Sequence, residues 1–464
     1  MIKTQKNDSS MKIAVIGSGI AGLSCAWLLA KHGGGSRQVT VFEQNDYLGG
    51  HTNTIDVSLE GITHPVDTGF LVFNDWTYPN LIALFKHIGV EDAASDMSFS
   101  VKLSEASGES KIEWSGSSLT TVFSQPSNLF RPRFWGMLND MVRFNREATA
   151  LAVHKAQMPG TVGQYLLANG YGQAFRDWYL APMAACIWST PTKKIDDFPL
   201  ATFLTFCHNH GLLSVTNRPQ WRTVKGGART YALKLAAELP DIRLNAAVTR
   251  VMRTEKNAIV TARGQTETFD HVVFACHTDQ TLKILGDASE AESRVLAAIP
   301  YLPNTAIVHT DRRLLPKRRR AWAAWNYQAM YAGSTPSDSS EHSANDGAVS
   351  LSYLINRLQP LPFKTPVIVT MNPLFPPDPQ TVIKTIAYDH PVFLADSIIA
   401  KRGLRTLQGE RRTWHAGAWT RYGFHEDGLM SGIAVAKALG ATVPWHTDVP
   451  AANNLALPYP GVDA

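Results

Sequence analysis

The start of the chain shows a change in hydrophobic period. The apolar run 13–16 is typical of a buried strand and ends abruptly at a cluster of glycines. After these glycines, apolar residues recur at helical spacing from Ile20 to Ala30. Residues 39–42 form a second apolar, β-branched run that ends at Glu43. The pattern therefore predicts a β-α-β unit.

Further along, strand patterns and helix patterns alternate. Residues 53–59 and 62–66 alternate as strands do around Glu60-Gly61, which predicts a hairpin. Apolar residues at helical spacing predict an amphipathic helix that ends near Gly89. The segment 130–211 is mostly helical in pattern and dense in aromatic residues. Shorter patterns predict strands at 242–251, 258–262, 271–275 and 367–370, irregular connections at 333–347 and 360–379, and a helix at 429–439.

Length and composition narrow the class of protein. A chain of 464 residues that is 44% hydrophobic has enough material for a sizeable core, and its length suggests two or three domains. Its net charge of +5 is spread along the chain, which gives no case for nucleic acid. The N-terminus is polar and no apolar stretch reaches the ~18 residues that span a bilayer, so a soluble protein is expected. Four well-separated cysteines without metal spacing favour reduced thiols in a cytoplasmic protein: Cys25, Cys186, Cys207 and Cys276.

One basic run stands out, at 317–320, close to Trp322 and Trp325. It has two interpretations, a contact with an anionic membrane surface and a solvated loop. A patch this short adds little affinity alone, which favours the loop. The prediction is a cytoplasmic protein, with peripheral contact at the inner face of the membrane left open.

The glycines after the first strand have the spacing of a dinucleotide fingerprint. Gly17 allows a tight turn, Gly19 lets a pyrophosphate approach the backbone, and Gly22 lets helix and strand pack closely. The helix N-terminus offers free N–H groups to the phosphates. Glu43 lies 21 residues after Gly22, near the ~20 expected for the acid that accepts hydrogen bonds from the ribose. The contacts predicted for this unit are Gly17, Gly19, Ile20, Ala21, Gly22, Glu43 and Gln44. NAD and FAD fit it equally.

The next segment separates these two cofactors. Gly49-Gly50-His51 follows Glu43 after a short loop, and here the chain resembles the flavin-containing amine oxidase and phytoene desaturase superfamily. The resemblance implies FAD, with the backbone of the Gly-Gly pair along its pyrophosphate. It also implies backbone close to the flavin at Asp67-Thr68-Gly69, and so adds Thr68 and Gly69 to the predicted contacts. This chain has His51 where Arg is usual, which weakens the case for a direct contact between a cation and phosphate.

Later segments agree with the resemblance. Gly226-Gly227 resembles the superfamily's second Gly-Gly motif, and Val248 opens a strand that resembles the one whose backbone meets the adenine. The segment 427–432 resembles a C-terminal acid-Gly-x-x-Ser-Gly motif at the start of a helix under the flavin ring, where N–H groups and the helix dipole stabilise negative charge on the reduced flavin. The contacts implied here are Gly417, Asp427, Gly428 and Leu429.

The wording of these motifs resembles one bacterial branch of predicted FAD/NAD-binding, amine-oxidase-like oxidoreductases. Characteristic segments are Tyr78-Pro79-Asn80-Leu81 and the stretch 423–428. Some relatives are thought to act on fatty-acyl chains. The resemblance therefore implies lipids as a candidate substrate class and dehydrogenation as the candidate reaction.

Other candidate residues have competing interpretations. His51, His415 and His425 are candidates for a base, a relay or a covalent flavin attachment, but hydrogen bonding to backbone or phosphate is the favoured reading. The histidines at 208 and 210 lack a third ligand, so no metal site is predicted. The aromatic residues between Phe134 and Trp188 either line an apolar pocket or form helix-packing core.

Together these observations predict an α/β fold, with a Rossmann-type, glutathione-reductase-like FAD-binding domain and an inserted α+β substrate domain. The FAD domain is assigned to 1–80, 215–285 and 405–464, and the substrate domain to 81–214 and 286–404. The predicted function is an FAD-dependent oxidoreductase that transfers a hydride from a hydrophobic or fatty-acyl substrate to flavin N5. The alternative is an accessory flavin- or NAD-binding partner of a lipid-modifying enzyme. No catalytic residue, electron acceptor, mode of FAD attachment or oligomeric state is assigned.

Overall fold

The fold is described from a computed structural model of the chain. No described helix is long and apolar enough to cross a membrane. The structure describes residues 10–105, 110–154, 158–188, 195–214, 218–330, 349–393 and 395–447.

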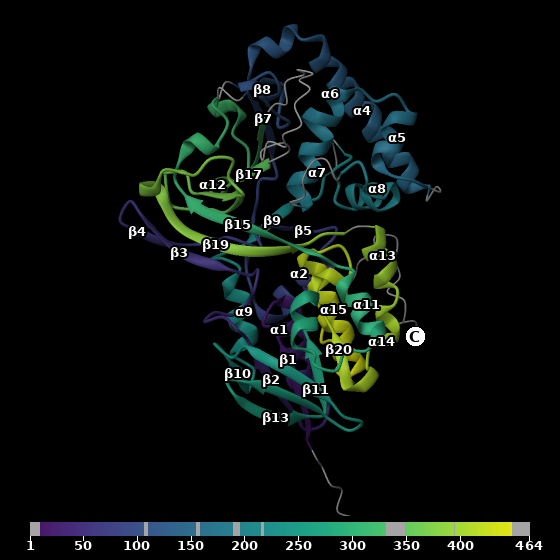
Figure 1. The fold of residues 1–464 in the computed structure, drawn as a ribbon. Coiled ribbons are helices and arrows are strands. Elements are labelled where there is room, and N and C mark those ends of the chain that lie inside the picture. Colours follow the sequence, from purple (N-terminus) through teal and green to yellow (C-terminus); the bar gives the residue numbers. More distant parts are fainter. Residues whose placement is uncertain are drawn as a thin grey trace, which may run out of the picture.

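A five-stranded parallel sheet forms the lower part of the molecule (Figure 1). Its strand order is β10-β2-β1-β14-β20, and every neighbouring pair is parallel. Strands far apart in the chain thus share one sheet, and their carboxyl ends meet at one edge. The strands are β1 (Met11–Ile16), β2 (Arg37–Phe42), β10 (Asp241–Arg243), β14 (His271–Phe274) and β20 (Thr413–His415).

Both faces of this sheet are covered, which explains why its central strands β1, β2 and β14 end in mostly apolar, buried runs. Ile13 and Val15 pack into a core shared with helices, whereas Ala14 and Ile16 pack against a three-stranded antiparallel sheet. Helices α1 and α15 lie in close contact. Glycine at position 432 makes this possible, because a Cβ there would lie 2.4 Å from the Ala21 carbonyl oxygen. The covering elements are α1 (Ile20–His32), α2 (Pro79–Ile88), α9 (Arg229–Ala236), α15 (His425–Ala438), β11 (Val248–Arg253), β12 (Ala258–Ala262) and β13 (Gln265–Phe269).

A seven-stranded mixed sheet dominates the upper part. Its order is β19-β15-β18-β17-β16-β7-β8, with only β16 and β7 parallel among its neighbouring pairs. The long antiparallel ribbon of β15 and β19 extends from the upper part of the molecule towards the lower part (Figure 1). The strands are β7 (Phe99–Ser104), β8 (Ser110–Ser115), β15 (Tyr301–His309), β16 (Trp325–Met330), β17 (Val349–Leu354), β18 (Ile368–Met371) and β19 (Val382–Pro391).

The aromatic-rich segment folds into helices beside this sheet. Phe134, Phe144, Phe175, Trp178 and Tyr179 are buried in one hydrophobic core with residues of the sheet. The side chain of Trp188 lies outside the described set. For the five buried residues named above, helix-packing core is therefore the correct interpretation, whereas Trp135 of the same segment is exposed. The helices are α4 (Pro132–Val153), α5 (Val162–Ala168), α6 (Gln173–Phe175), the π-helix η2 (Arg176–Leu180), α7 (Ala181–Trp188) and α8 (Leu200–Asn209).

Smaller elements connect the two parts. The predicted hairpin is β3 (Thr54–Leu59) with β4 (Ile62–Asp67), and β9 (Trp221–Val224) pairs with both β5 (Phe73–Asn74) and β6 (Asp92–Ala94). Short helices also occur between strands of the two larger sheets: α10 (Thr278–Ile284), α11 (Glu290–Ala297), α12 (Ile355–Leu358), α13 (Ala395–Lys401) and α14 (Leu404–Leu407).

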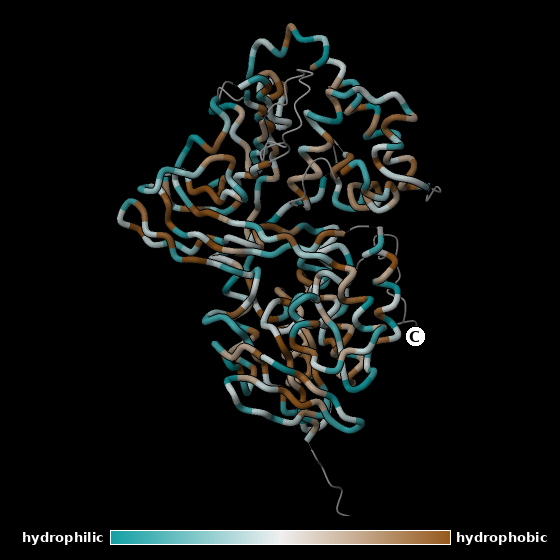
Figure 2. Tube along the Cα trace, in the orientation of Figure 1, coloured by the Kyte–Doolittle hydropathy of each residue, from teal (hydrophilic) through white to brown (hydrophobic). Residues whose placement is uncertain are grey.

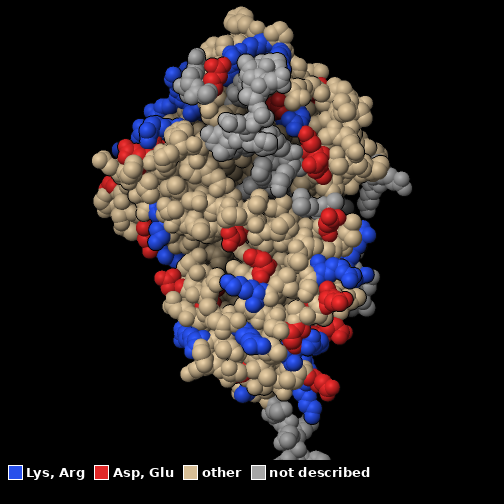
Figure 3. Space-filling view, in the orientation of Figure 1, with Lys and Arg blue, Asp and Glu red and all other residues tan. Residues whose placement is uncertain are grey.

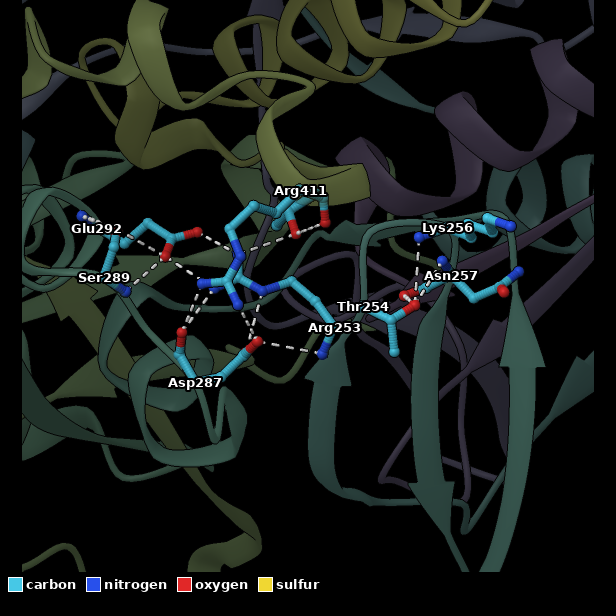
Figure 4. A network of polar contacts seen from close by, with 9 residues as sticks. Arg253, Thr254, Lys256, Asn257, Asp287, Ser289, Glu292 and Arg411 are labelled. Atoms are coloured by element: carbon cyan, nitrogen blue, oxygen red, sulfur yellow. Dashed lines mark hydrogen bonds and ion pairs between the residues drawn. The ribbon is translucent and has the colours of Figure 1, made fainter.

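A buried ionic network fastens the sheet edge to the helices above it (Figure 4). The fully buried Arg253 guanidinium pairs with Asp287 and Glu292 and donates to Thr413 Oγ1 on β20 at 3.1 Å. Burial alone would raise the pKa of Glu292, but hydrogen bonds from Arg253 and Ser289 lower that pKa to about 2. The two carboxylates compensate the buried charge of Arg253. Through its hydrogen bond to Thr413, Arg253 also links the end of β11 to β20, the strand that precedes α15.

The structure corrects two element boundaries. The pattern at 242–251 predicts one strand, but β10 and β11 belong to different sheets and are separated by a turn with Asn245 at φ 51°. The C-terminal helix begins at His425, before the predicted Leu429, because its acidic first turn interrupts the apolar pattern. The predicted connection at 333–347 lies outside the described residues.

The division into a discontinuous FAD domain and a substrate domain stays a prediction. The parallel sheet draws strands from each of the three stretches assigned to the FAD domain, which supports it. Leu81, Leu84 and Phe85 of α2 are buried in the core around α1, however, although the predicted boundary lies at residue 80. We therefore place that boundary after Gly89 in our proposal.

Candidate functional site

One cavity of about 570 Å³ extends from the glycine-rich turn to aromatic side chains of the upper part. This volume lies within the usual range of small-molecule sites. We call its two ends the nucleotide end and the aromatic end. The nucleotide end is formed around Gly17, Ser18, Gly19, Glu43, Gly49 and Gly50, and the aromatic end around Phe206, Trp221, Trp325, Tyr353 and Phe424.

The three fingerprint glycines have different surroundings. Gly17 has φ 105°, and a Cβ there would lie 2.7 Å from the Ala275 carbonyl oxygen. A Cβ at Gly22 would lie 1.9 Å from the Gly17 carbonyl oxygen, so Gly22 serves packing and does not line the cavity. A Cβ at Gly19 would meet no protein atom within 4 Å, among the residues described, and Gly19 lines the cavity. Gly19 therefore leaves room for a ligand.

Glu43 is fixed at the end of β2 by hydrogen bonds that the sequence did not predict. Its Oε2 accepts from the Ser18 N–H at 3.0 Å and from the Ser18 hydroxyl at 2.5 Å, and its Oε1 accepts from the Asn45 N–H at 2.9 Å. The carboxylate is buried and lines the cavity together with Gln44. Ser18 thus positions the acid that is expected to bind ribose.

The predicted Gly-Gly pair lies against the first glycine turn. Gly49 N–H donates to the Ser18 carbonyl oxygen at 3.1 Å, and a Cβ at Gly50 would lie 3.4 Å from the Gly19 Cα. Both residues line the cavity. Two stretches of backbone therefore form one surface at the nucleotide end.

His51 is half-buried, and its ring lies 4.9 Å from the Tyr388 ring and 5.3 Å from the His390 ring. Within the described chain its Nε2 has no hydrogen-bond partner. Burial, followed by repulsion from neighbouring histidines, holds the pKa of His51 well below its ordinary value. The lowered pKa favours the neutral form of His51 as long as no anion lies beside it.

The Asp67-Thr68-Gly69 turn anchors the hairpin more than it lines the cavity. Asp67 accepts hydrogen bonds from Thr54, from the Ala228 N–H at 2.8 Å and from Gln359 Nε2 at 2.7 Å. Thr68 lies outside the cavity lining, with its hydroxyl 2.8 Å from the Tyr388 hydroxyl, and its predicted flavin contact stays a prediction. Gly69 does line the cavity.

The C-terminal motif also divides into lining and supporting residues. Gly428 lines the cavity, but Leu429 is fully buried in the core. Asp427 accepts from the N–H groups of Tyr422 and Phe424, at 3.2 and 3.0 Å, and does not line the cavity. The side chains of Asp427 and Leu429 thus have supporting roles, and their predicted contact with the cofactor stays a prediction.

Glu426 joins two motifs that the sequence places 346 residues apart. Its carboxylate accepts from the N–H groups of Asn80 and Leu81, at 2.8 and 2.9 Å, and so caps the first turn of α2. Burial raises the pKa of Glu426 to about 7, despite these hydrogen bonds. Of the two acids in the 423–428 segment, Glu426 thus orients α2.

A buried hydrogen-bonded chain runs beside the cavity. The Tyr231 hydroxyl lies 2.5 Å from Thr52 Oγ1 and 2.5 Å from His425 Nε2. The His425 ring is stacked on Phe70 at 3.7 Å and lines the cavity. Burial lowers the pKa of His425 to about 3, so it is neutral. Thr52 and Tyr231 carry no motif signal, and only the folded chain shows them together.

Rings from several elements form the aromatic end. Phe206 is stacked on His210 at 3.9 Å and on Phe424 at 4.8 Å, and Trp325 packs edge-on against Tyr353 at 4.9 Å. Burial lowers the pKa of His210 to about 4. Among the described residues, no group of three or more His, Cys, Asp or Glu side chains is arranged to hold a metal ion.

His415 lies away from the cavity. It is buried and stacks on Phe274 at 5.7 Å, and it does not line the cavity. Of the three histidine candidates, His51 and His425 therefore remain. The predicted contacts that do line the cavity are Gly17, Gly19, Ile20, Ala21, Glu43, Gln44, Gly49, Gly50, His51, Gly69, Val248, Gly417 and Gly428.

The site fits FAD on three observations. The open space at Gly19 suits a pyrophosphate close to the backbone. The N-terminus of α1 has no side-chain cap, so its N–H groups are free to bind phosphate. The unpartnered Nε2 of His51 offers a polar atom to a ligand in the cavity.

Comparison with known proteins agrees with this fit. The family model of flavin-containing amine oxidoreductases matches residues 20–440. A fatty acid isomerase from P. acnes and a putrescine oxidase bound to putrescine are similar structures, with TM-scores of 0.63 and 0.64 and sequence identities of 15% and 14%. Each alignment covers 93% of this chain and 99% of the other. The 15-cis-phytoene desaturase of Synechococcus elongatus is 31% identical over 117 residues, which is 25% of this chain and 19% of that protein.

The fold and the cavity define a Rossmann-type FAD protein, a flavin-dependent oxidoreductase. More particularly, the chain belongs to the family of flavin-containing amine oxidoreductases. The predicted superfamily, fold class and cofactor are thereby confirmed.

Proposed function

We propose that this protein removes a hydride equivalent from an uncharged, hydrophobic substrate, of which a fatty-acyl chain is the favoured example. The proposal rests mainly on one observation: a single cavity extends from the dinucleotide turn at Gly19 to the aromatic rings around Trp325. When bound, FAD supplies a two-electron acceptor, and the protein supplies position and electrostatics.

The residues that we assign to FAD binding are the predicted contacts that line the cavity. Backbone around Gly19 and Gly50 would hold the pyrophosphate, and Glu43 would accept hydrogen bonds from the ribose. The α15 N-terminus, with Gly428 at the cavity, would place N–H groups and a positive dipole end beside the isoalloxazine. These assignments rest on the family membership and the cavity together.

The residues that define the aromatic end carry no formal charge. The whole lining, as far as the structure describes it, includes no Lys or Arg and two carboxylates, Asp389 and Glu43, and Glu43 lies at the nucleotide end, where it is engaged by Ser18. Burial lowers the pKa values of His210, His390 and His425 to about 4, 4 and 3, so these rings bear no charge near neutrality. An apolar chain gains burial there without needing a counter-ion.

The similar structures include proteins named for a fatty acid and for an amine, so both classes belong in the test. The experiment is anaerobic reduction of the bound flavin, followed by its absorbance, with separate panels of unsaturated or methyl-branched acyl lipids, isoprenoids and amines. We expect bleaching by members of the lipid panels. Bleaching by amines alone would overturn the proposed substrate class.

Two other outcomes separate the alternatives. Flavin that no panel reduces, with activity only in the presence of a second protein, would favour the accessory role over catalysis. A protein that stays colourless after incubation with FAD would contradict the proposed cavity assignment.

A further inference from the structure

Large apolar side chains are exposed at the top of the molecule. They lie on α3 (Leu119–Val122), on the 3-10 helix η1 (Pro126–Phe130) and on the first turn of α4. Figure 2 shows a hydrophobic stretch at this extremity. Leu119 is 79% exposed and Phe130 is 85% exposed. We define the apex surface as these two residues with Leu129 and Trp135, which are 45% and 50% exposed.

The apex surface is held in place by buried neighbours. Asn128 is fully buried, and its Nδ2 donates to the Glu113 carbonyl oxygen at 3.1 Å. Trp135 Nε1 donates to the Leu129 carbonyl oxygen at 3.0 Å, and Phe134 beside it is fully buried. The fold therefore presents Phe130 to solvent on ordered backbone, although it has a core next to it. Large apolar side chains exposed on neighbouring elements at one end of a molecule are typical of an interaction site.

Cations surround the apex surface. Residues 110–135 and 314–324 contain seven Lys and Arg and one carboxylate, Glu113. Glu113 is fully buried and paired with Arg318, so it does not offset the others at the surface. The 3-10 helix η5 (Arg319–Ala321), from the basic run, packs against α3. Figure 3 shows Lys and Arg gathered across the top and upper left of the molecule.

Four of these cations are exposed and have no ion pair within the described residues: Arg133 on α4, and Lys317, Arg319 and Arg320 in the basic run. The sequence alone favours a solvated loop for this run, because four basic residues add little affinity by themselves. The tertiary structure adds the second half of a membrane-binding surface, since it brings the run beside exposed leucine and phenylalanine side chains.

We propose that the apex surface binds the interface of an anionic lipid bilayer, with Leu119 and Phe130 inserted among the acyl chains and Arg319 and Arg320 at the headgroups. Apolar residues ringed by cations are the combination that such an interface recognises. A protein partner of ordinary chemistry would need no such excess of positive charge. This inference does not depend on which substrate the cavity takes.

The test is co-sedimentation of the full chain with vesicles of phosphatidylcholine alone and with vesicles that contain about 30 mol % phosphatidylglycerol. We expect binding to the anionic vesicles, weakened by salt, and at least about tenfold weaker binding to the neutral ones. Replacing two cations, as Arg319→Gln/Arg320→Gln, should weaken binding to anionic vesicles by about thirtyfold.

The apolar part is tested with Leu119→Ser/Phe130→Ser, which we expect to abolish binding while leaving the thermal midpoint unchanged. The matched control is Leu167→Ser on α5, because Leu167 is 85% exposed like Phe130 but lies outside the apex surface. If the wild-type protein bound neither type of vesicle, the proposal would be overturned. The proposal would also be overturned if Leu119→Ser/Phe130→Ser bound anionic vesicles as well as the wild type does. A concentration-dependent dimer in sedimentation without lipid, abolished by Leu119→Ser/Phe130→Ser, would overturn it too.

Discussion

The nucleotide end and the aromatic end of the cavity are built by different means. At the nucleotide end, short loops present backbone, and the contacts are between neighbouring turns such as Ser18 and Gly49. At the aromatic end, side chains from separate elements meet, as Phe206 of α8 meets Phe424 before α15. Backbone recognition requires few residue types and one conformation, whereas a wall of rings depends on the packing of whole domains.

This difference predicts which amino-acid substitutions each end of the cavity tolerates. Glycine positions at the nucleotide end are fixed by sterics, because a Cβ would strike protein at Gly17 and would reach into the cavity at Gly19. Rings at the aromatic end are exchangeable for others of similar size, as long as the wall stays filled. Cofactor binding should therefore be sensitive at the first end, and substrate choice at the second.

The largest expected effect is that of Gly19→Val. The side chain meets no described protein atom within 4 Å and the backbone has φ −62°, so the fold should be preserved. Because valine would occupy the space for the pyrophosphate, we expect FAD affinity to fall at least about a thousandfold, or about 4 kcal/mol. Flavin absorbance and titration calorimetry measure this loss.

The control for that variant is Gly136→Val on α4, which also meets nothing within 4 Å but lies far from the cavity lining. It should bind FAD normally. Undiminished flavin content in Gly19→Val would contradict the assignment of the nucleotide end.

The second effect concerns pH at the aromatic end. Because burial lowers the folded pKa of His210 to about 4, the folded state disfavours its protonation. Its contribution to stability is full above the unfolded pKa of about 6.5 and is lost as pH falls towards 4. Between pH 7 and pH 5 the loss should approach about 2 kcal/mol.

Comparing wild type with His210→Gln in denaturant titrations at both pH values isolates this contribution. Buried carboxyls act in the opposite direction, since burial raises the pKa values of Asp67 and Glu426 to about 7, but they are common to both proteins. Parallel pH dependence in the two proteins would show that His210 titrates normally.

The third effect concerns the chain of hydrogen bonds beside the cavity. Tyr231→Phe removes the hydroxyl that joins Thr52 to His425 and leaves two buried polar atoms without it. We expect a loss of about 1–3 kcal/mol in unfolding free energy, with FAD still bound. Chemical denaturation and flavin content measure the two quantities, and loss of FAD without loss of stability would contradict a supporting role.

The smallest effect is expected for Trp325→Phe at the aromatic end. The change keeps a ring but shrinks the wall that faces Tyr353, so KM for the apolar substrate should rise about tenfold while flavin content stays constant. Trp322→Phe is the control, because Trp322 lies outside the cavity lining. Steady-state kinetics distinguish the two variants, and equal KM values would weaken the proposed position of the substrate.

Much of the nucleotide end could be predicted from sequence because its rules are local. The strand, the glycine turn and the helix after Ile20 are where the pattern predicts them, and Glu43 lies at the end of β2. The motifs also predict contacts at Thr68, Asp427 and Leu429, and these stay predictions. The side chains of these residues support the turn, the loop before α15 and the core, since a motif gives the position of the backbone but not the direction of each side chain.

The sequence by itself determined the Rossmann unit and its glycines, because each depends on backbone geometry and on contacts within one β-α-β segment. Only the tertiary structure decided the rest. Glu426 reaches Asn80 across 346 positions, and Tyr231 reaches His425 across 194. Packing over such separations follows from the whole fold, and no local period encodes it. The aromatic end and the apex surface arise in this way.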